Sequence, residues 1–331
     1  MKNAKEEMSM TTDEKFNQIY QTIVNENTDN MELARGEARS ENRYNMIVLT
    51  IIIIINIALD YGLYKITYDF PWGFVVNLIF ISFVIYIYIR REGKREEYTT
   101  DFKTKIVGTM IKSFEEQIEF TPQIGLSSIV YGEAEFERYD RYRSEDLIHG
   151  TLKNNCKFEM AEVLTERVQI ENNEKPICST IFSGLFAKME TPKPFNTLLY
   201  LRKDRIDKNL LDRVFTWNLP FDKLRIQLDS PEFEKIFDVY ASDQIIAMQL
   251  LTADIMQDLI QFHNEMGMDY ELTIKENCMY IRFWCGGMFE TAKLKKFSLD
   301  RDTLYKYYRM LDFTFSLTNK MIKLLNETQY N

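Results

Sequence analysis

The sequence has few of the residues on which metal binding usually depends. It contains only two histidines, His149 and His263, and four widely spaced cysteines without a CxxC pair: Cys156, Cys178, Cys278 and Cys285. A zinc site needs several such ligands in close local pairs, so the sequence predicts no metal site. The cysteines do not form a disulfide framework and indicate reduced thiols in a cytosolic compartment.

Motifs for cofactor binding and nucleophilic catalysis are also absent. No GxxxxGK[ST], GxGxxG or GxSxG motif occurs, so the sequence gives no local evidence for a phosphate-binding loop or a nucleophile elbow. His263 and Glu265 with Cys278 and Cys285 distantly suggest a zinc deaminase, but that chemistry needs a CxxC pair. We therefore predict no catalytic, cofactor-binding or metal-binding residue and no cofactor. We expect His263 to be a hydrogen-bonded structural histidine and Cys285 to be a buried thiol at a strand end.

An excess of basic residues is missing. Lys and Arg number 41 against 50 Asp and Glu, a formal net charge of -9. Nucleic-acid binding depends on basic surface that meets phosphates, so nucleic acid is not an expected partner. With 12 glycines and 7 prolines and no repeats, the 331-residue chain is expected to be ordered, in one or two domains.

Two long apolar runs dominate what is present. Tyr44 to Tyr64 spans 21 residues with one charge, Asp60, and Phe70 to Ile89 spans 20 residues with none. At a rise of about 1.5 Å per residue, each helix would cover roughly 30 Å, the thickness of a bilayer's hydrocarbon core. The alternative is a pair of buried core segments, but both runs are several times longer than ordinary strands. The runs predict two membrane spans.

Charge sets the predicted orientation. Lys65 to Asp69 joins the spans and carries one basic residue, whereas the outer flanks carry seven: Arg35, Arg39, Arg43, Arg90, Arg91, Lys94 and Arg95. The positive-inside bias places both termini in the cytoplasm. We expect a two-span protein of the cell (inner) membrane, with the first span as an uncleaved anchor. Asp60 and Asn56 are polar residues within the span whose role is open; Asp60 lies near enough to the outer interface to be hydrated.

The soluble parts predict an α+β fold. We divide the chain into an N-terminal amphipathic helix (1–43), the transmembrane hairpin (44–89), a stalk helix (90–122) and a cytoplasmic α+β domain (123–331) with a mainly antiparallel sheet. Alternating apolar residues predict hairpins around residues 153–155 and 275–277. Thr252 and Gly267 should begin and end one helix, and a long helix should follow Asp300.

The acidic stretch LDSPEFEKIFDVYASDQ, residues 228–244, has two interpretations. It is either a catalytic cluster or a corner, at which the chain turns from a strand into a capped helix. Asp229 or Ser230 can cap a helix that begins with Pro231, and Phe233 and Phe237 would share one face of it. Glu232 follows Asp229 at capping-box spacing. We favour the corner, in which only Glu234 has no assigned role.

Three ordered segments carry a family resemblance. RYDRYRSEDLIHG (138–150), IFSGLFAKM (181–189) and LDSPEFEKIFDVYASDQIIAMQLLT (228–252) resemble a family of bacterial membrane proteins known only as a domain of unknown function. The resemblance implies a two-span hairpin followed by a cytoplasmic α+β domain. It implies no reaction, cofactor or catalytic residue.

Two function classes therefore remain. The first is a non-enzymatic, membrane-anchored interaction or scaffold module that contacts the lipid bilayer and a protein partner or another copy of itself. The second is a hydrolase-type enzyme at the membrane face, whose site would gather dispersed residues such as Arg141, Asp229 or Glu234. The candidate residues for partner or lipid contact are basic: Arg90, Arg91, Lys94, Arg95, Arg138, Arg141 and Arg143.

Overall fold

A computed structural model describes most of the chain, namely residues 11–66, 72–114, 117–169, 176–203, 224–287 and 301–327. The described residues form two compact units. One is the helical unit, residues 17–66 and 72–106. The other is the sheet unit, residues 11–16, 107–114, 117–169, 176–203, 224–287 and 301–327.

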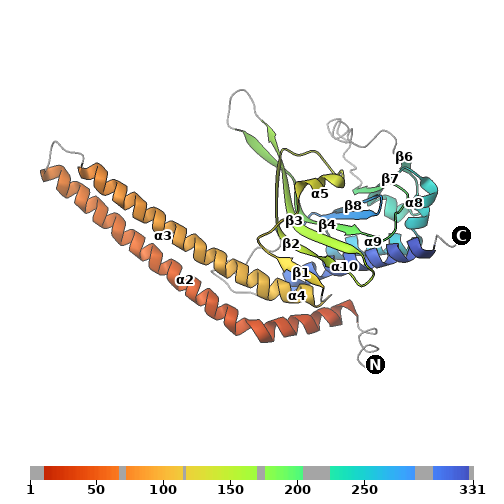
Figure 1. Ribbon diagram of the computed structural model, residues 1–331, viewed down its shortest axis with the longest axis horizontal. Coiled ribbons are helices and arrows are strands. Elements are labelled where there is room, and N and C mark those ends of the chain that lie inside the picture. Colours follow the sequence, from red (N-terminus) through yellow and green to blue (C-terminus); the bar gives the residue numbers. More distant parts are fainter. Residues whose placement is uncertain are drawn as a thin grey trace. The chain divides into compact units, whose positions relative to one another are not determined.

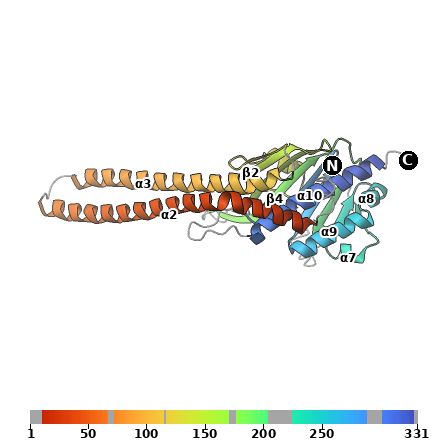
Figure 2. The same ribbon diagram turned by 90° about the horizontal axis from the view of Figure 1, so that it is seen from below.

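The helical unit is a pair of long helices, α2 (Thr12–Ile66) and α3 (Trp72–Phe102), which lie side by side in both views (Figures 1 and 2). The predicted amphipathic helix and the first apolar run are thus one continuous helix. Its segment Asp29–Leu59 is long and apolar enough to cross a membrane, with a mean hydropathy of 1.7. The second predicted span lies largely in α3, while residues 67–71, which include most of the predicted loop, lie outside the described residues. The pair of spans remains a prediction.

The sheet unit is built on one nine-stranded sheet in which all described pairings are antiparallel, as the predicted α+β fold requires. The strand order is β1-β2-β3-β4-β9-β8-β5-β7-β6. The bounds are β1 Ile118–Thr121, β2 Arg141–Thr151, β3 Lys157–Gln169, β4 Ile177–Glu190, β5 Leu199–Lys203, β6 Leu224–Ile226, β7 Phe237–Ala241, β8 Tyr270–Lys275 and β9 Cys278–Phe283. Both predicted hairpins, β2–β3 and β8–β9, are confirmed.

Helices α9 (Ala253–Met266) and α10 (Arg301–Glu327) pack on one face of this sheet (Figure 2). Phe262 of α9 stacks on Phe313 of α10 at 3.9 Å between ring centroids, and both rings contact Phe283 of β9. Thr252 caps α9 through Ile255 N, and Gly267 ends it in the left-handed region at φ 58°, as predicted. The long apolar stripe of α10 therefore packs within its own domain.

The opposite face carries α5 (Ser128–Glu133) and the irregular residues that follow it. Tyr131 of α5 packs on Phe182 and Phe186 of β4, with ring centroids 6.1 and 4.9 Å away, in a cluster that also buries Ala161. The sheet thus has apolar packing on both faces, which explains why β4 is apolar on both sides.

The predicted stalk helix is wrong at its C-terminal end. After α3 the chain continues as a π-helix, η1 (Lys103–Val107), and a short α4 (Gly108–Lys112), and then Ile118–Thr121 form the edge strand β1. A four-residue spacing of apolar residues extended the predicted helix too far. Ile118 instead pairs with Gly150, where a Cβ would lie 2.3 Å from Gln117 O, so this close approach needs glycine.

The acidic stretch at residues 228–244 is a corner, as favoured. Ser230 caps α7 (Pro231–Glu234) through Phe233 N, so the Asp229–Glu232 capping box is not formed. Phe237 begins β7 and does not continue the helix, although its ring still lies 5.0 Å from that of Phe233. The Glu234 carboxylate accepts a hydrogen bond from Leu228 N at 2.8 Å, a role that sequence analysis did not find. Asp243 then caps α8 (Gln244–Leu250).

Candidate functional site

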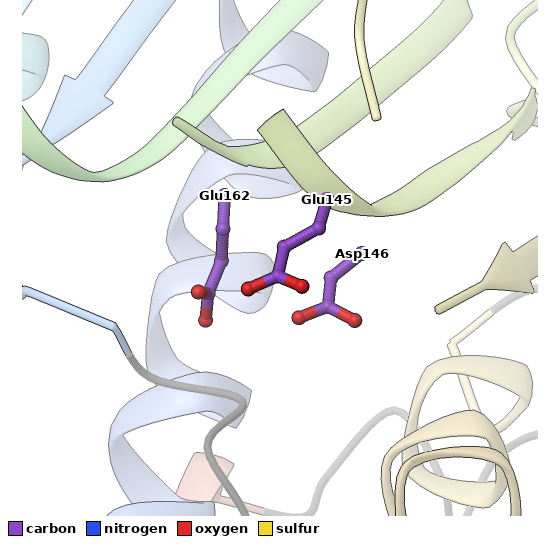
Figure 3. Close-up of side chains that lie close together, drawn as sticks. All are labelled: Glu145, Asp146 and Glu162. Carbon is purple, nitrogen blue, oxygen red and sulfur yellow. The ribbon is translucent and has the colours of Figure 1, made fainter. Parts of the chain in front are cut away.

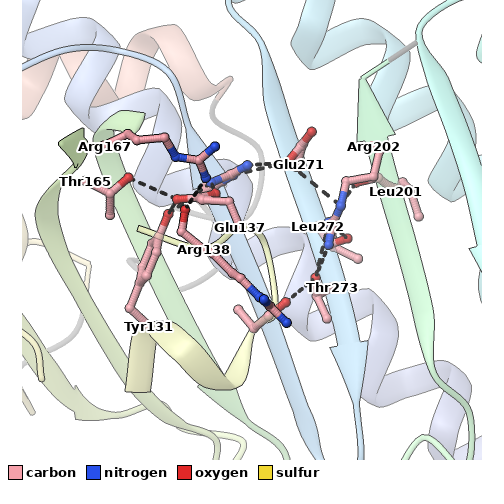
Figure 4. Close-up of polar contacts among 12 residues, drawn as sticks. Tyr131, Glu137, Arg138, Thr165, Arg167, Leu201, Arg202, Glu271, Leu272 and Thr273 are labelled. Carbon is pink, nitrogen blue, oxygen red and sulfur yellow. Dashed lines mark hydrogen bonds and ion pairs between the residues drawn. The ribbon is translucent and has the colours of Figure 1, made fainter. Parts of the chain in front are cut away.

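A short segment that begins at the last residue of α5 crosses the sheet and is held by a network of charged side chains (Figure 4). We call residues Glu133–Glu137 the strap. Its three carboxylates alternate with Ala134 and Phe136, and each carboxylate accepts a hydrogen bond from a tyrosine and contacts a cation. The strap is not a strand, because Glu133 ends α5, Ala134 has helical dihedral angles and Glu135 lies in the left-handed region at φ 53°. The repeated contact of a carboxylate with a tyrosine and a cation makes the strap the candidate site.

The deepest contact of the strap joins Glu137 to Arg282 of β9. Arg282 is 4% exposed and pairs with the Glu137 carboxylate, which also accepts hydrogen bonds from Tyr131 at 2.6 Å and Thr165 at 3.0 Å. On its other side, the Arg282 guanidinium donates to Glu271 of β8 at 2.7 and 3.1 Å. Two carboxylates therefore surround one buried cation, and its charge-assisted hydrogen bonds offset much of the cost of desolvation.

A second arginine extends this arrangement across the sheet. Arg202 of β5 lies 4.0 Å from Glu271 and donates hydrogen bonds to Thr273 and to the Leu272 carbonyl, each at 3.3 Å. The ring of Phe136 contacts both guanidinium groups, with centroid distances of 4.7 Å to Arg202 and 4.3 Å to Arg282. Such cation–π contacts are strongest where water is excluded. The strap's one aromatic ring is thus fixed between two cations.

The other two strap carboxylates make similar but more exposed contacts. Glu133 accepts hydrogen bonds from Lys188 of β4 at 2.7 Å and Tyr280 of β9 at 3.1 Å. Glu135 accepts hydrogen bonds from Lys275 of β8 at 2.8 Å and Tyr200 of β5 at 2.6 Å. The strap therefore joins five strands, because Thr165 of β3 completes the set.

The protonation chemistry of the network indicates paired, fixed charges. Burial lowers the pKa of Arg202 to about 10, which still leaves it charged at neutral pH. Burial also opposes the charge on Arg282, but Tyr131, Glu271 and Glu137 raise the pKa of this guanidinium above its ordinary value. Burial opposes ionisation of Glu133, yet its hydrogen bonds from Lys188 and Tyr280 hold its pKa below the ordinary value. The network stabilises and orders this face of the sheet.

Sequence analysis missed this network because its members are far apart in the chain. The signal that it left unused is local: GEAEFE, residues 132–137, alternates acid with apolar residues. Such a period of two favours an extended segment, whereas in the structure Glu133 ends α5 and Glu135 takes a φ of 53°. Its partners on other strands follow only from the sheet order.

A second acidic group lies where β2 bends. Glu145, Asp146 and Glu162 bring carboxylate oxygens within 4.8 Å of one another (Figure 3). The β2–β3 register shifts between Glu145 and Ile148, and Asp146 takes a φ of 62° there, so that the consecutive side chains of Glu145 and Asp146 extend to the same side as Glu162 of β3 (Figure 3). Oxygen sets of this kind suit hard cations. Each of the three residues also has a further interaction partner, however, so the group does not by itself define a metal site.

The predicted contact arginines lie in both units. In the helical unit, Arg90 pairs with Glu41 of α2 at 3.0 Å and Arg91 is exposed; the side chains of Lys94 and Arg95 are outside the described set. In the sheet unit, the Arg138 carbonyl accepts a hydrogen bond from Arg167 at 3.0 Å.

Arg141 and Arg143 are separated by one residue on β2 and share a face of that strand. Arg141 donates to the Cys178 sulfur at 3.3 Å, and Arg143 lies 3.6 Å from the Glu166 carboxylate. Both arginines are exposed. This agrees with a salt-bridged entry into a strand, and partner contact by these residues remains a prediction.

The histidines and cysteines have ordinary environments. His263 packs between the rings of Phe237 and Tyr270, and its buried Nδ1 has no hydrogen-bond partner among the described residues, so the predicted hydrogen bond is not observed. His149 lies 3.9 Å from Glu119 near the surface. Burial raises the pKa of both Cys156 and Cys285 to about 12, which makes these thiols unreactive at neutral pH.

Fold and site together define a class of protein. It has an antiparallel α+β domain, a pair of long apolar helices in the same chain, and a strap that ion pairs and hydrogen bonds hold on the sheet. Residues 180–323 match the model of a family described as a protein of unknown function (DUF3137), which supports the unknown-function part of the resemblance. No curated protein sequence matches the chain. Among solved structures, the mycobacterial trehalose monomycolate transport factor A, TtfA, is similar with a TM-score of 0.33 and 9% identity, over 65% of this chain and 95% of that one. A likeness this distant indicates no shared function.

Proposed function

We propose that this protein is a two-span inner-membrane protein whose α+β domain is a docking module for a protein partner at the cytoplasmic face. The first support is the surface of the helical unit. Only 6% of the apolar window of α2 is buried, and large apolar side chains on both helices face outward. They include Ile47, Ile51, Ile54, Ile57 and Leu59 on α2 and Ile79, Ile81, Ile85 and Ile89 on α3. Contiguous apolar surface on this scale suits lipid, because water would make it costly.

The observation that carries the two-span topology concerns the first turn of α2. Phe16 is 1% exposed and packs against Tyr305 and Tyr308 of α10, with centroid distances of 5.1 and 5.4 Å. Tyr305 also donates to Asp13 at 2.7 Å. The N-terminal end of α2 therefore belongs to the sheet unit and must lie on the same side of a membrane as that unit. Residues 17–106 then cross an even number of times, which supports two crossings.

The basic flanks support the cytoplasmic side. Seven Lys and Arg residues flank the apolar runs on the sheet-unit side, whereas the connection between the runs has Lys65 alone. The pairing of Arg90 with Glu41 fits this arrangement, because it places the polar ends of the two helices next to each other.

The geometry favours a docking module over an enzyme. Arg141 lies at the start of β2, whereas Asp229 and Glu234 lie beside β7, six strand positions away in the sheet order. At about 4.8 Å per strand, these groups are roughly 29 Å apart. Glu234 is already engaged by Leu228 N, and the buried arginines are paired with carboxylates. The dispersed residues of the enzyme hypothesis do not form one site.

Thiol accessibility tests the topology. A Thr67→Cys variant carries a new thiol between the two apolar runs, and the natural Cys178 is exposed on the sheet unit. In intact spheroplasts, a membrane-impermeant maleimide should label the introduced thiol and leave Cys178 unlabelled until the membrane is permeabilised. Alkaline carbonate should leave the chain in the membrane fraction. Release by carbonate, or labelling of both thiols in intact spheroplasts, would contradict the proposal.

The docking role has its own test. We expect affinity purification from membranes in mild detergent to recover a specific protein with the wild-type chain and less of it with Arg141→Glu/Arg143→Glu. The matched control is Lys157→Glu, an exposed basic residue on the far end of β3. Equal recovery with the wild type, the double variant and the control would show that Arg141 and Arg143 do not contact the partner.

A further inference from the structure

The helices α2 and α3 meet along a seam, and one ion pair sets their register. Asn45 of α2 and Ile87 of α3 are 5% and 7% exposed and lie in this seam. Arg90 Nη2 lies 3.0 Å from Glu41 Oε1, so these two residues are at the same level of the pair. The seam separates two flanks of the helical unit, and Glu41 and Arg90 share one of them.

On α2, the other flank carries two arginines. Each residue turns a helix by about 100°, so the residues just before and just after a seam position lie on opposite flanks. Glu41 precedes the half-buried Asn42, whereas Arg43 follows it. Arg39 lies four residues before Arg43 and so shares its face. Arg39 and Arg43 therefore lie on the flank away from Glu41.

On α3, Arg91 belongs to this same flank. Arg90 comes three residues after Ile87 and Arg91 comes four residues after it, which places them about 60° to one side of Ile87 and about 40° to the other. Because Arg90 lies on the Glu41 flank, Arg91 lies on the opposite one. We call Arg39, Arg43 and Arg91 the arginine flank.

The charges of the arginine flank are available to a ligand. All three arginines are exposed, and none of them has an ion-pair partner among the residues that the structure describes. Arg90 on the other flank is already paired with Glu41. The helices run in opposite directions (Figure 1), so Arg91 lies level with residue 40, between Arg39 and Arg43. One anionic group can therefore contact arginines of both helices.

Apolar surface continues directly from the arginine flank. Met46 and Tyr88 each come one position after a seam residue, which places them on this flank, and they are 49% and 60% exposed. Arg43 immediately precedes the first apolar run, and Arg91 comes two residues after the second. Tyrosine is enriched at membrane interfaces, so the arginines lie at the level where lipid headgroups begin.

We propose that the arginine flank binds the phosphate group of an anionic membrane phospholipid, whose acyl chains lie against the apolar surface beside Met46 and Tyr88. A guanidinium donates two parallel hydrogen bonds to phosphate, and unpaired positive charge at this depth favours an anionic lipid over a zwitterionic one. The inference rests on the proposed membrane location, which brings phosphate groups to this level of the helices.

Native mass spectrometry tests the site on the full chain in detergent, with equal amounts of phosphatidylglycerol and phosphatidylcholine added. The wild type should bind mainly phosphatidylglycerol. Arg43→Gln/Arg91→Gln should lower phosphatidylglycerol binding about tenfold and leave phosphatidylcholine binding unchanged. Arg43→Lys/Arg91→Lys keeps the charge and should retain most of the preference. Arg90→Gln is the matched control on the other flank and should change binding less than about twofold, because Glu41 already pairs with this arginine.

Three results would overturn the proposal. They are equal binding of the two lipids by the wild type, a loss in Arg90→Gln as large as in the double variant, and loss of a co-purified protein from the double variant while phosphatidylglycerol binding is kept. The last result would assign the flank to a protein partner. Carbonate extraction tests the membrane location separately. If carbonate releases the chain, the anchoring proposal fails, and the lipid preference in detergent still decides whether these arginines recognise the headgroup.

Discussion

At the scale of single residues, Arg282 has the largest structural role that the sequence did not reveal. In the sequence it is one basic residue in an alternating strand, YIRFW, with no motif around it. In the fold it is buried between Glu137 and Glu271 and contacts the rings of Phe136 and Trp284. Without its cation, two carboxylates would be left in a site of low dielectric constant.

Arg282→Met tests this role. The variant keeps the length and apolar stem of the side chain but leaves Glu137 and Glu271 unpaired, so we expect the free energy of unfolding to fall by about 3–5 kcal/mol. Urea unfolding of the full chain in detergent, followed by tryptophan fluorescence, measures this change. The control is Arg143→Met, which removes an exposed pair with Glu166 and should cost less than about 1 kcal/mol. Equal losses in the two variants would show that the network does not stabilise the domain.

The corner at residues 228–244 shows how far residue-level patterns extend. Local chemistry was enough to predict a cap at Ser230 and a tolerated Pro231, because both depend on neighbours within one turn. It did not predict the Glu234 contact with Leu228 N, six residues earlier in the chain, nor that Phe237 leaves the helix for β7. Both outcomes depend on the pairing of β7 in the sheet, which sets the path of the chain after α7.

At the scale of elements, the contact between β4 and β9 depends on a glycine. A Cβ on Gly184 would lie 1.9 Å from the Phe283 carbonyl oxygen, whereas a Cβ on Gly132 of α5 would meet nothing within 4 Å. We expect Gly184→Ala to lower the unfolding free energy by about 2 kcal/mol or more, since backbone atoms must separate. Gly132→Ala should raise it by up to about 1 kcal/mol, because alanine favours a helix. Thermal unfolding of both variants decides this; a neutral Gly184→Ala would show that the strands can separate without cost.

The contact between α9 and α10 should weaken in acid. The hydrogen bonds from Arg309 lower the pKa of Glu265 below its ordinary 4.5, against the opposing effect of burial. A carboxyl whose folded pKa is depressed contributes stability above its unfolded pKa and loses that contribution as the pH falls through the folded value. Glu265→Gln removes the titration. The stability difference between wild type and variant should therefore be constant near neutral pH and shrink below about pH 4.5. Urea titrations at several pH values measure it, and a difference independent of pH would contradict the assignment.

Element identity was largely predictable where periodicity was long and capping residues were clear, as in α9 with Thr252 and Gly267. The prediction was wrong at Ile118–Thr121, which form an edge strand. Four residues are too few to show a clear strand alternation, and the helical spacing of the preceding apolar residues extended through them. The order of strands was not predictable. It places β5 between β8 and β7, although β5 comes far earlier in the chain, and so determines which charges meet under the strap.

At the scale of the whole molecule, the first turn of α2 matters most, because the chain leaves the sheet unit after Phe16 and enters it again at Val107. Phe16 provides the attachment of the N-terminal end of α2 within the sheet unit, where its ring is buried against Tyr305 and Tyr308. The sequence showed an apolar face on this helix but not its partner, since Tyr305 and Tyr308 lie near the opposite end of the chain.

Phe16→Ala should release this attachment without unfolding the sheet unit. Removing a buried phenylalanine ring costs about 3 kcal/mol or more, so hydrogen exchange of the amides in the first turn of α2 should become at least about a hundredfold faster. The peptides of α10 beyond Phe313 should keep their protection. Gln18→Ala, an exposed change on the same helix, is the control and should leave the exchange unchanged. If Phe16→Ala exchanges like wild type, the N-terminal end of α2 is not bound to the sheet unit, and the support it gives to an even number of membrane crossings is lost.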